Sequence, residues 1–154
     1  MPAPPPHWPD PEIGNDGPTT IVVGVDFSDS ADRAFSYAAG VARRSGSRLI
    51  AAYVVGSSGL AETVGLTAGV TARQAGDCTE IEVELQDRVK KVACDIEVEL
   101  RVLHGSPAEA LARLASRLHA DLLVVGTTHH ARPLKRSIGE QLGRDAECPV
   151  VVIP

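Results

Sequence analysis

The residues best suited to bind an anion lie in one short basic loop and at the start of the helix expected after it. The loop runs from Thr127 to Arg136, includes His129, and lies between Gly126 and Ser137. A glycine at a strand end allows a ligand to approach the backbone closely. The N–H groups at a helix N-terminus favour a phosphate, and cationic side chains strengthen such a site. A basic loop that is merely solvated has the same composition, so the loop by itself supports either interpretation.

Two further groups of polar or small residues follow apolar runs. Asp26 comes directly after the run Ile21–Val25, and Gly105 stands before Ser106 and Pro107. The Asp26 carboxylate has two interpretations: it accepts hydrogen bonds from the hydroxyl or amine groups of a ligand, or it helps to cap the following helix. Ser106 and Pro107 have the residue types typical of a helix start.

Strands and helices that alternate along the chain would position these groups. Apolar runs predict buried strands, and the alternation over 96–103 predicts a strand with one face partly wet. Helical spacing predicts a helix capped by Asp29 or Ser30 and ending near Gly46. The expected strands cover residues 21–25, 49–55, 96–103, 122–125 and 150–153, and the expected helices cover 31–44, 77–93, 107–118 and a short segment from 137. The alternation predicts an α/β fold, a doubly wound parallel sheet with helices on both faces. Ligands of such sheets bind outside the carboxyl ends of the strands.

Composition limits the possible partners and the compartment. The chain has 154 residues, a net charge of −5 and 3% aromatic residues, which argues against a nucleic-acid binder and against docking to an anionic membrane. No signal peptide or spanning segment is expected, so we expect a cytoplasmic protein. The three cysteines, Cys78, Cys94 and Cys148, are expected to be reduced and buried as small apolar side chains.

Proline-rich residues 1–17 differ in character from the rest of the chain. Prolines and acidic residues there predict a disordered arm in which Trp8 is the one residue suited to anchoring. Residues 18–154 are expected to form a single domain, because one core typically serves about 100–200 residues.

Several motifs in the same order resemble those of the universal stress protein family, across residues 19–154. They are IVVGVDFSDSADRAFSYAAGVARRSGSRLIAAYVV, HGSPAEALARLA, DLLVVGTTHH and SIGEQLGRDAECPVVVIP. The resemblance implies a five-stranded parallel sheet of the adenine nucleotide alpha-hydrolase-like type. Many members of the family bind ATP and others do not. It also implies that Asp26 contacts ribose, that Val54 contacts adenine, and that Gly105 shapes the wall of the cleft.

The phosphate motif of the family is only partly present. The motif is Gly, two residues, Gly, nine residues, Gly and then Ser or Thr, with a backbone contact from the next residue. Strict counting from Gly126 puts Gly139 and Glu140 at the final pair, whereas alignment on the closing helix puts Arg136 and Ser137 there. The second alignment keeps Ile138 inward and is preferred.

In that alignment Gly126 and Ser137 match the motif, and Thr127 and Ile138 are their neighbours. His129 and Arg136 replace glycines, where they would either bind phosphate or fill its space.

The expected function is that of a stress-response regulator with ATP, together with Mg²⁺, or another adenine nucleotide as ligand. An alternative is a dimeric interaction module of the same fold that binds no nucleotide. A slow ATPase is a third reading, although no general base is identifiable and no catalytic or metal-binding residue is assigned. The resemblance further implies a homodimer paired through the last strand, Val150 to Ile153.

Overall fold

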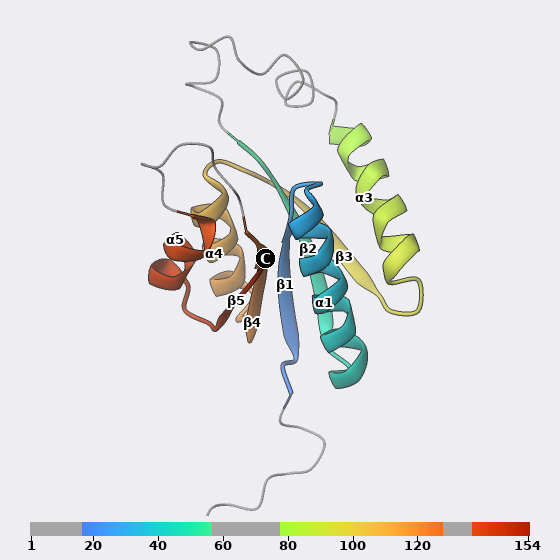
Figure 1. The fold of residues 1–154 in the computed structure, drawn as a ribbon, viewed down its shortest axis with the longest axis horizontal. Coiled ribbons are helices and arrows are strands. Elements are labelled where there is room, and N and C mark those ends of the chain that lie inside the picture. The colour runs from blue at the N-terminus through green and yellow to red at the C-terminus, as the bar shows by residue number, and fades with distance from the viewer. Residues whose placement is uncertain (1–16, 57–77, 128–136) are drawn as a thin grey trace, which may run out of the picture.

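Five parallel strands form one sheet at the centre of the molecule (Figure 1). The computed structural model describes residues 17–56, 78–127 and 137–154. The strand order is β3-β2-β1-β4-β5. The bounds are β1 (Thr20–Val25), β2 (Arg48–Val55), β3 (Val98–His104), β4 (Leu122–Gly126) and β5 (Val150–Ile153). The expected doubly wound α/β fold is confirmed.

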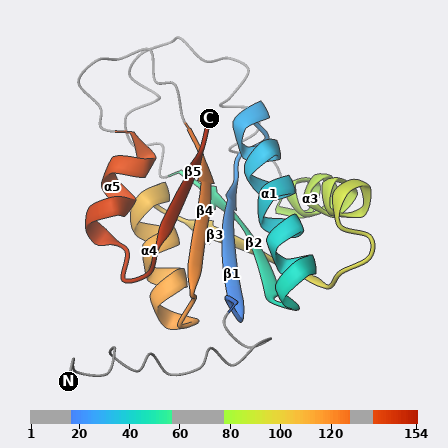
Figure 2. The same cartoon turned by 60° about the horizontal axis from the view of Figure 1, so that its bottom comes forward.

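Helices cover both faces of the sheet (Figure 2). The helices α1 (Asp29–Ser45) and α3 (Cys78–Val92) lie on one face, and α4 (Pro107–Arg117) and α5 (Ile138–Asp145) lie on the other. Each expected helix is present, with its ends shifted by at most a few residues.

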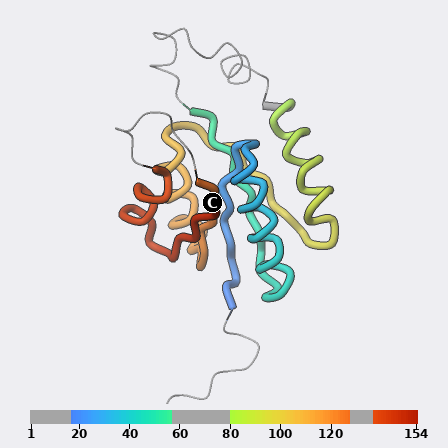
Figure 3. Tube along the Cα trace, in the orientation of Figure 1, coloured from blue at the N-terminus to red at the C-terminus, as the bar shows by residue number. Residues whose placement is uncertain are grey.

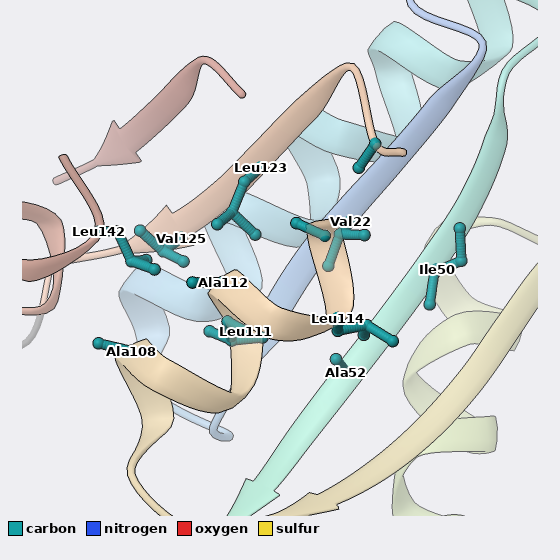
Figure 4. Close-up of a cluster of buried hydrophobic side chains, with 12 residues drawn as sticks. Val22, Ile50, Ala52, Ala108, Leu111, Ala112, Leu114, Leu123, Val125 and Leu142 are labelled. Atoms are coloured by element: carbon teal, nitrogen blue, oxygen red, sulfur yellow. The ribbon is translucent and has the colours of Figure 1, made fainter. Parts of the chain in front are cut away.

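Two apolar clusters hold the layers together, one on each face of the sheet. On the face of α4 and α5, Leu111 and Leu142 pack against sheet residues such as Val22, Ile50 and Leu123 (Figure 4). On the opposite face, Phe35 and several alanines of α1 pack against the alternate residues of the same strands. Each central strand is therefore buried on both sides, as its continuous apolar run predicts.

The ends of α1 show which capping signals the helix uses. Its N-cap is Ser28, whose hydroxyl accepts a hydrogen bond from the Ala31 N–H at 3.2 Å. The expectation of Asp29 or Ser30 is therefore wrong, because the helix begins one residue earlier. At the C-terminal end, Gly46 has a φ of 67°, the left-handed conformation expected of a capping glycine.

The chain reverses its direction of winding between β1 and β4. From β1 it adds β2 and then β3 on one side, and it afterwards crosses to β4 and β5 on the other, as the Cα trace shows (Figure 3). The strand β1 therefore pairs with both β2 and β4. In doubly wound sheets this switch point is where ligands bind.

The expectation that the cysteines are buried is wrong for Cys94, which is exposed. Cys94 lies in the turn after α3, where an apolar pattern no longer determines which side chains face the core. Cys148 is half-buried, and the side chain of Cys78 lies outside the described residues. Trp8 and the rest of residues 1–16 also lie outside them.

Candidate functional site

The turn after β1 brings Asp26 beside the start of α1. The Asp26 carboxylate accepts hydrogen bonds from the N–H of Ser28, at 3.0 Å, and from its hydroxyl. Ser28 in turn caps α1. Both interpretations of Asp26 thus remain: it supports the helix start through Ser28, and as an exposed carboxylate it retains acceptor positions for a ligand.

The end of β4 lies directly against the same helix start. A Cβ on Gly126 would lie 2.5 Å from the carbonyl carbon of Ser30 and 2.6 Å from the nitrogen of Ala31. The glycine is needed here because α1 approaches the β4 backbone this closely, a packing reason that differs from the ligand approach inferred from sequence. The carboxyl ends of β1 and β4 therefore meet at one place.

Thr127, directly after β4, forms hydrogen bonds to the start of α1 and to the end of β5. Its carbonyl accepts a hydrogen bond from the Ser30 hydroxyl at 2.8 Å, and its N–H donates to the carbonyl of Ile153 at 2.8 Å. The Oγ1 of Thr127 is buried and has no hydrogen-bond partner within the described part of the chain. A buried hydroxyl in this condition carries a desolvation cost that a polar ligand atom would relieve.

The helix α5, whose N-cap is Ser137, begins at the same end of the sheet as α1 (Figure 2). Ser137 and Glu140 form a capping box: the Ser137 hydroxyl accepts from the Glu140 N–H at 3.2 Å, and the Glu140 carboxylate accepts from the Ser137 N–H at 3.1 Å. The cap uses the hydroxyl as an acceptor, so its own proton can still be donated. The N–H groups of Ile138 and Gly139 belong to the first turn and have no intrahelical acceptor.

Gly105 and Val54 lie toward the β3 side of the same edge. Gly105 has a φ of 117°, which strongly favours glycine, and its N–H donates to the carbonyl of Val55 at 3.0 Å. Val54 pairs with Leu103 and is partly buried against the cluster beneath α4. His129 and Arg136 lie outside the described residues.

Phe27 is a prominent feature of this edge that the sequence analysis did not identify. It has a φ of 63°, an uncommon conformation for a residue with a large side chain. Its ring lies 5.0 Å from that of Tyr53, and the guanidinium of Arg88 lies 4.9 Å from its centroid. No spacing rule predicts this contact, because Arg88 belongs to a helix distant in sequence.

Metal binding finds no support in the described segments. Among them, no group of three or more His, Cys, Asp or Glu side chains is arranged to hold a metal ion.

The architecture is thus that of a doubly wound α/β protein with a candidate site at its β1/β4 switch point. The model of the universal stress protein family matches residues 18–154. A universal stress protein of Methanocaldococcus jannaschii is 32% identical over 139 residues, covering 86% of this chain and 80% of that protein. The chain belongs to the universal stress protein family.

Solved structures show the same architecture. The protein UspA of Lactobacillus plantarum matches with a TM-score of 0.72 and 26% identity, covering 91% of this chain and 100% of that one. A universal stress protein solved in complex with cAMP matches with a TM-score of 0.65 and 30% identity, covering 90% and 98% respectively. Within the described segments, no helix combines the length and apolarity needed to cross a membrane.

Proposed function

We propose that this chain is a stress-response regulator that binds an adenine nucleotide, ATP with Mg²⁺, at the carboxyl ends of β1 and β4. The observation that carries the proposal is the junction of the two strand ends at the switch point. There the Ser30 hydroxyl bonds the Thr127 carbonyl and is linked through Ser28 to the exposed Asp26 carboxylate. The Thr127 hydroxyl has no partner among the described residues. The relative in complex with cAMP supports an adenine nucleotide as the ligand class.

In this proposal the nucleoside lies over β1 and β2. The Asp26 carboxylate accepts hydrogen bonds from the ribose hydroxyls, and Val54 contacts the adenine. Gly105 shapes the wall of the cleft, because its φ of 117° disfavours any residue with a side chain and the space where a Cβ would stand is open. Asp26 suits a hydroxyl-bearing group, because an ionised carboxylate acts only as an acceptor.

The phosphates in this proposal lie between the end of β4 and the start of α5. The α1 start is a poor alternative, because Asp26 already binds Ser28 there and Asp29 and Asp32 occupy the first turn. At α5, the N–H groups of Ile138 and Gly139 and the hydroxyl proton of Ser137 would be the donors to phosphate. Gly126 and Thr127 would complete the phosphate site, with His129 and Arg136 as its cations.

Titration of the nucleotide-free protein with Mg-ATP tests the proposal. Asp26→Asn removes the charge of the side chain and keeps its shape. We expect Kd to rise about tenfold, because that is the effect on affinity of losing one charge-assisted hydrogen bond. Asp87→Asn on the exposed side of α3 is the matched control and should leave Kd unchanged. Equal affinity in the wild type and Asp26→Asn would rule out the assigned ribose contact, and no binding to the wild type would rule out the function.

A second candidate is an interaction module that binds no nucleotide, for which β5 supplies the observation. This strand is at the edge of the sheet, no described strand pairs with its outer side, and Val152 is 40% exposed. Exposed apolar edge strands tend to pair with another chain. A second copy pairing through Val150–Ile153 would form a homodimer under either candidate, and the cytoplasm is the compartment we propose for both.

A further inference from the structure

The conformation of Phe27 raises the question of what holds the turn between β1 and α1. Its φ of 63° is a strained value for any residue with a Cβ. Strained backbone persists only where surrounding contacts impose it. The turn carries Asp26 on one side of Phe27 and the α1 cap, Ser28, on the other.

The side-chain contacts of Phe27 come from elements outside the turn. The Arg88 guanidinium lies 4.9 Å from the Phe27 ring centroid and forms an ion pair with Asp32 in the first turn of α1. Arg88 is also held by Glu84, one helical turn earlier in α3, at 3.6 Å. Tyr53 contacts the ring from β2, with the centroids 5.0 Å apart.

Arg88 therefore connects α3 to the turn after β1, at the edge of the candidate site. Its side chain is 29% exposed, and it contacts the ring and the carboxylate together. A planar guanidinium can stack on a ring while its N–H groups pair with a carboxylate, whereas a lysine ammonium lacks that plane. In Figures 1 and 2, α3 lies beside α1 on the same face of the sheet.

We infer that Arg88 is a positioning residue for nucleotide binding: it holds Phe27 in the left-handed conformation and thereby fixes Asp26 in place to accept the ribose. The inference rests on the proposed function. Without Arg88 the strain at Phe27 is no longer offset, and the turn relaxes toward conformations that misplace Asp26. Apparent affinity then falls with the fraction of molecules that keep the competent turn.

The test is a double-mutant cycle of Arg88→Gln and Phe27→Gly, with Mg-ATP as the probe. In the Phe27 background we expect Arg88→Gln to raise Kd about threefold to tenfold. In the Phe27→Gly background it should change Kd by less than about twofold, because glycine adopts this φ without strain. Arg88→Lys should lie closer to Arg88→Gln than to the wild type, and Lys90→Gln on the same helix should match the wild type.

Amide hydrogen exchange of residues 26–31, without nucleotide, provides a second readout. We expect faster exchange in Arg88→Gln only where Phe27 is present. An equal loss of affinity in both backgrounds, or unchanged exchange in Arg88→Gln, would overturn the inference. If the wild type does not bind Mg-ATP, the proposed function fails. The comparison of hydrogen exchange in Arg88→Gln with and without Phe27 then decides whether Arg88 holds the turn.

Discussion

At the residue scale, the close packing at Gly126 leaves no room for a side chain. Gly126 lies against the backbone of Ser30 and Ala31, so its missing side chain determines how closely β4 and α1 approach. The strand-end glycine was identifiable from sequence because it closes a buried apolar run. Its packing role was not, because the partner atoms lie almost a hundred residues earlier in the chain.

Gly126→Ala should destabilise the fold. The new Cβ would meet backbone atoms 2.5 and 2.6 Å away, which cannot move aside as a flexible side chain would. Overpacking of this kind typically costs about 1–3 kcal/mol. Gly143→Ala in α5 is the matched control, since nothing lies within 4 Å of its added Cβ. Urea unfolding measures both, and equal stability of Gly126→Ala and Gly143→Ala would contradict this packing role of Gly126.

At the scale of elements, local sequence determined most of what the structure shows. Apolar patterns and turn residues predicted every described strand and helix, because burial on both faces makes each central strand a continuous apolar run, whereas the less buried β3 alternates apolar and polar residues. Ends were less predictable: β3 begins at Val98 and not at Ile96, and Ser28 caps α1. Such ends depend on hydrogen bonds that competing neighbours, such as Ser28, Asp29 and Ser30, are all able to make.

The three serine caps should differ in their value to stability. Ser137 belongs to a capping box, whereas Ser106 is an N-cap whose side chain makes no capping hydrogen bond. Ser137→Ala should therefore lower the free energy of unfolding by about 1 kcal/mol. Ser106→Ala should change it little, and Ser28→Ala should resemble Ser137→Ala because its hydroxyl caps α1. Equal effects at positions 137 and 106 in chemical unfolding would contradict this assignment of caps.

At the scale of the whole molecule, one carboxylate joins the starts of the two central strands. Asp121 precedes β4 and accepts hydrogen bonds from the N–H and hydroxyl of Thr19 and from the N–H of Thr20 at the start of β1. These bonds hold the pKa of Asp121 below its usual value. The carboxylate lies at the end of the sheet opposite the candidate site, so it affects the stability of the fold without taking part in binding.

Stability should depend on pH through Asp121. Because the folded pKa is lowered, its contribution is fully present above the unfolded value of about 3.9 and is lost as the pH falls through the folded pKa. Asp121→Asn should therefore unfold at lower urea concentration than the wild type at neutral pH, and the gap should narrow as the pH falls below about 4. A gap that stayed constant down to low pH would show that the charge of Asp121 makes no contribution.

The association of two chains also belongs to this scale. Val151→Lys places a charge on the β5 edge, so it should turn a strand-paired dimer into monomers in sedimentation experiments. Val83→Lys is the control, because Val83 is 53% exposed on α3, away from β5. An unchanged sedimentation profile for Val151→Lys would count against pairing through this strand.

The sequence predicted where the candidate residues lie more completely than it predicted the contacts that support them. Asp26, Gly105, Gly126 and Ser137 all lie at the carboxyl edge of the sheet, as strand-end placement predicts. The contact of Arg88 with Phe27 was not predictable, because it joins two distant elements through side-chain geometry. His129 and Arg136 lie outside the described residues, and their phosphate contacts remain predictions.

The most direct test of nucleotide binding at the switch point is a map of amide chemical shifts as Mg-ATP is added to the isotope-labelled protein, which at 16.2 kDa per chain suits this method. We predict that the amide signals of residues 26–31, 126–127 and 137–139 change position, and that those of Thr19, Thr20 and Asp121 at the opposite end of the sheet do not. If no amide signal changes position, or if only signals at the opposite end do, the result would contradict nucleotide binding at the switch point.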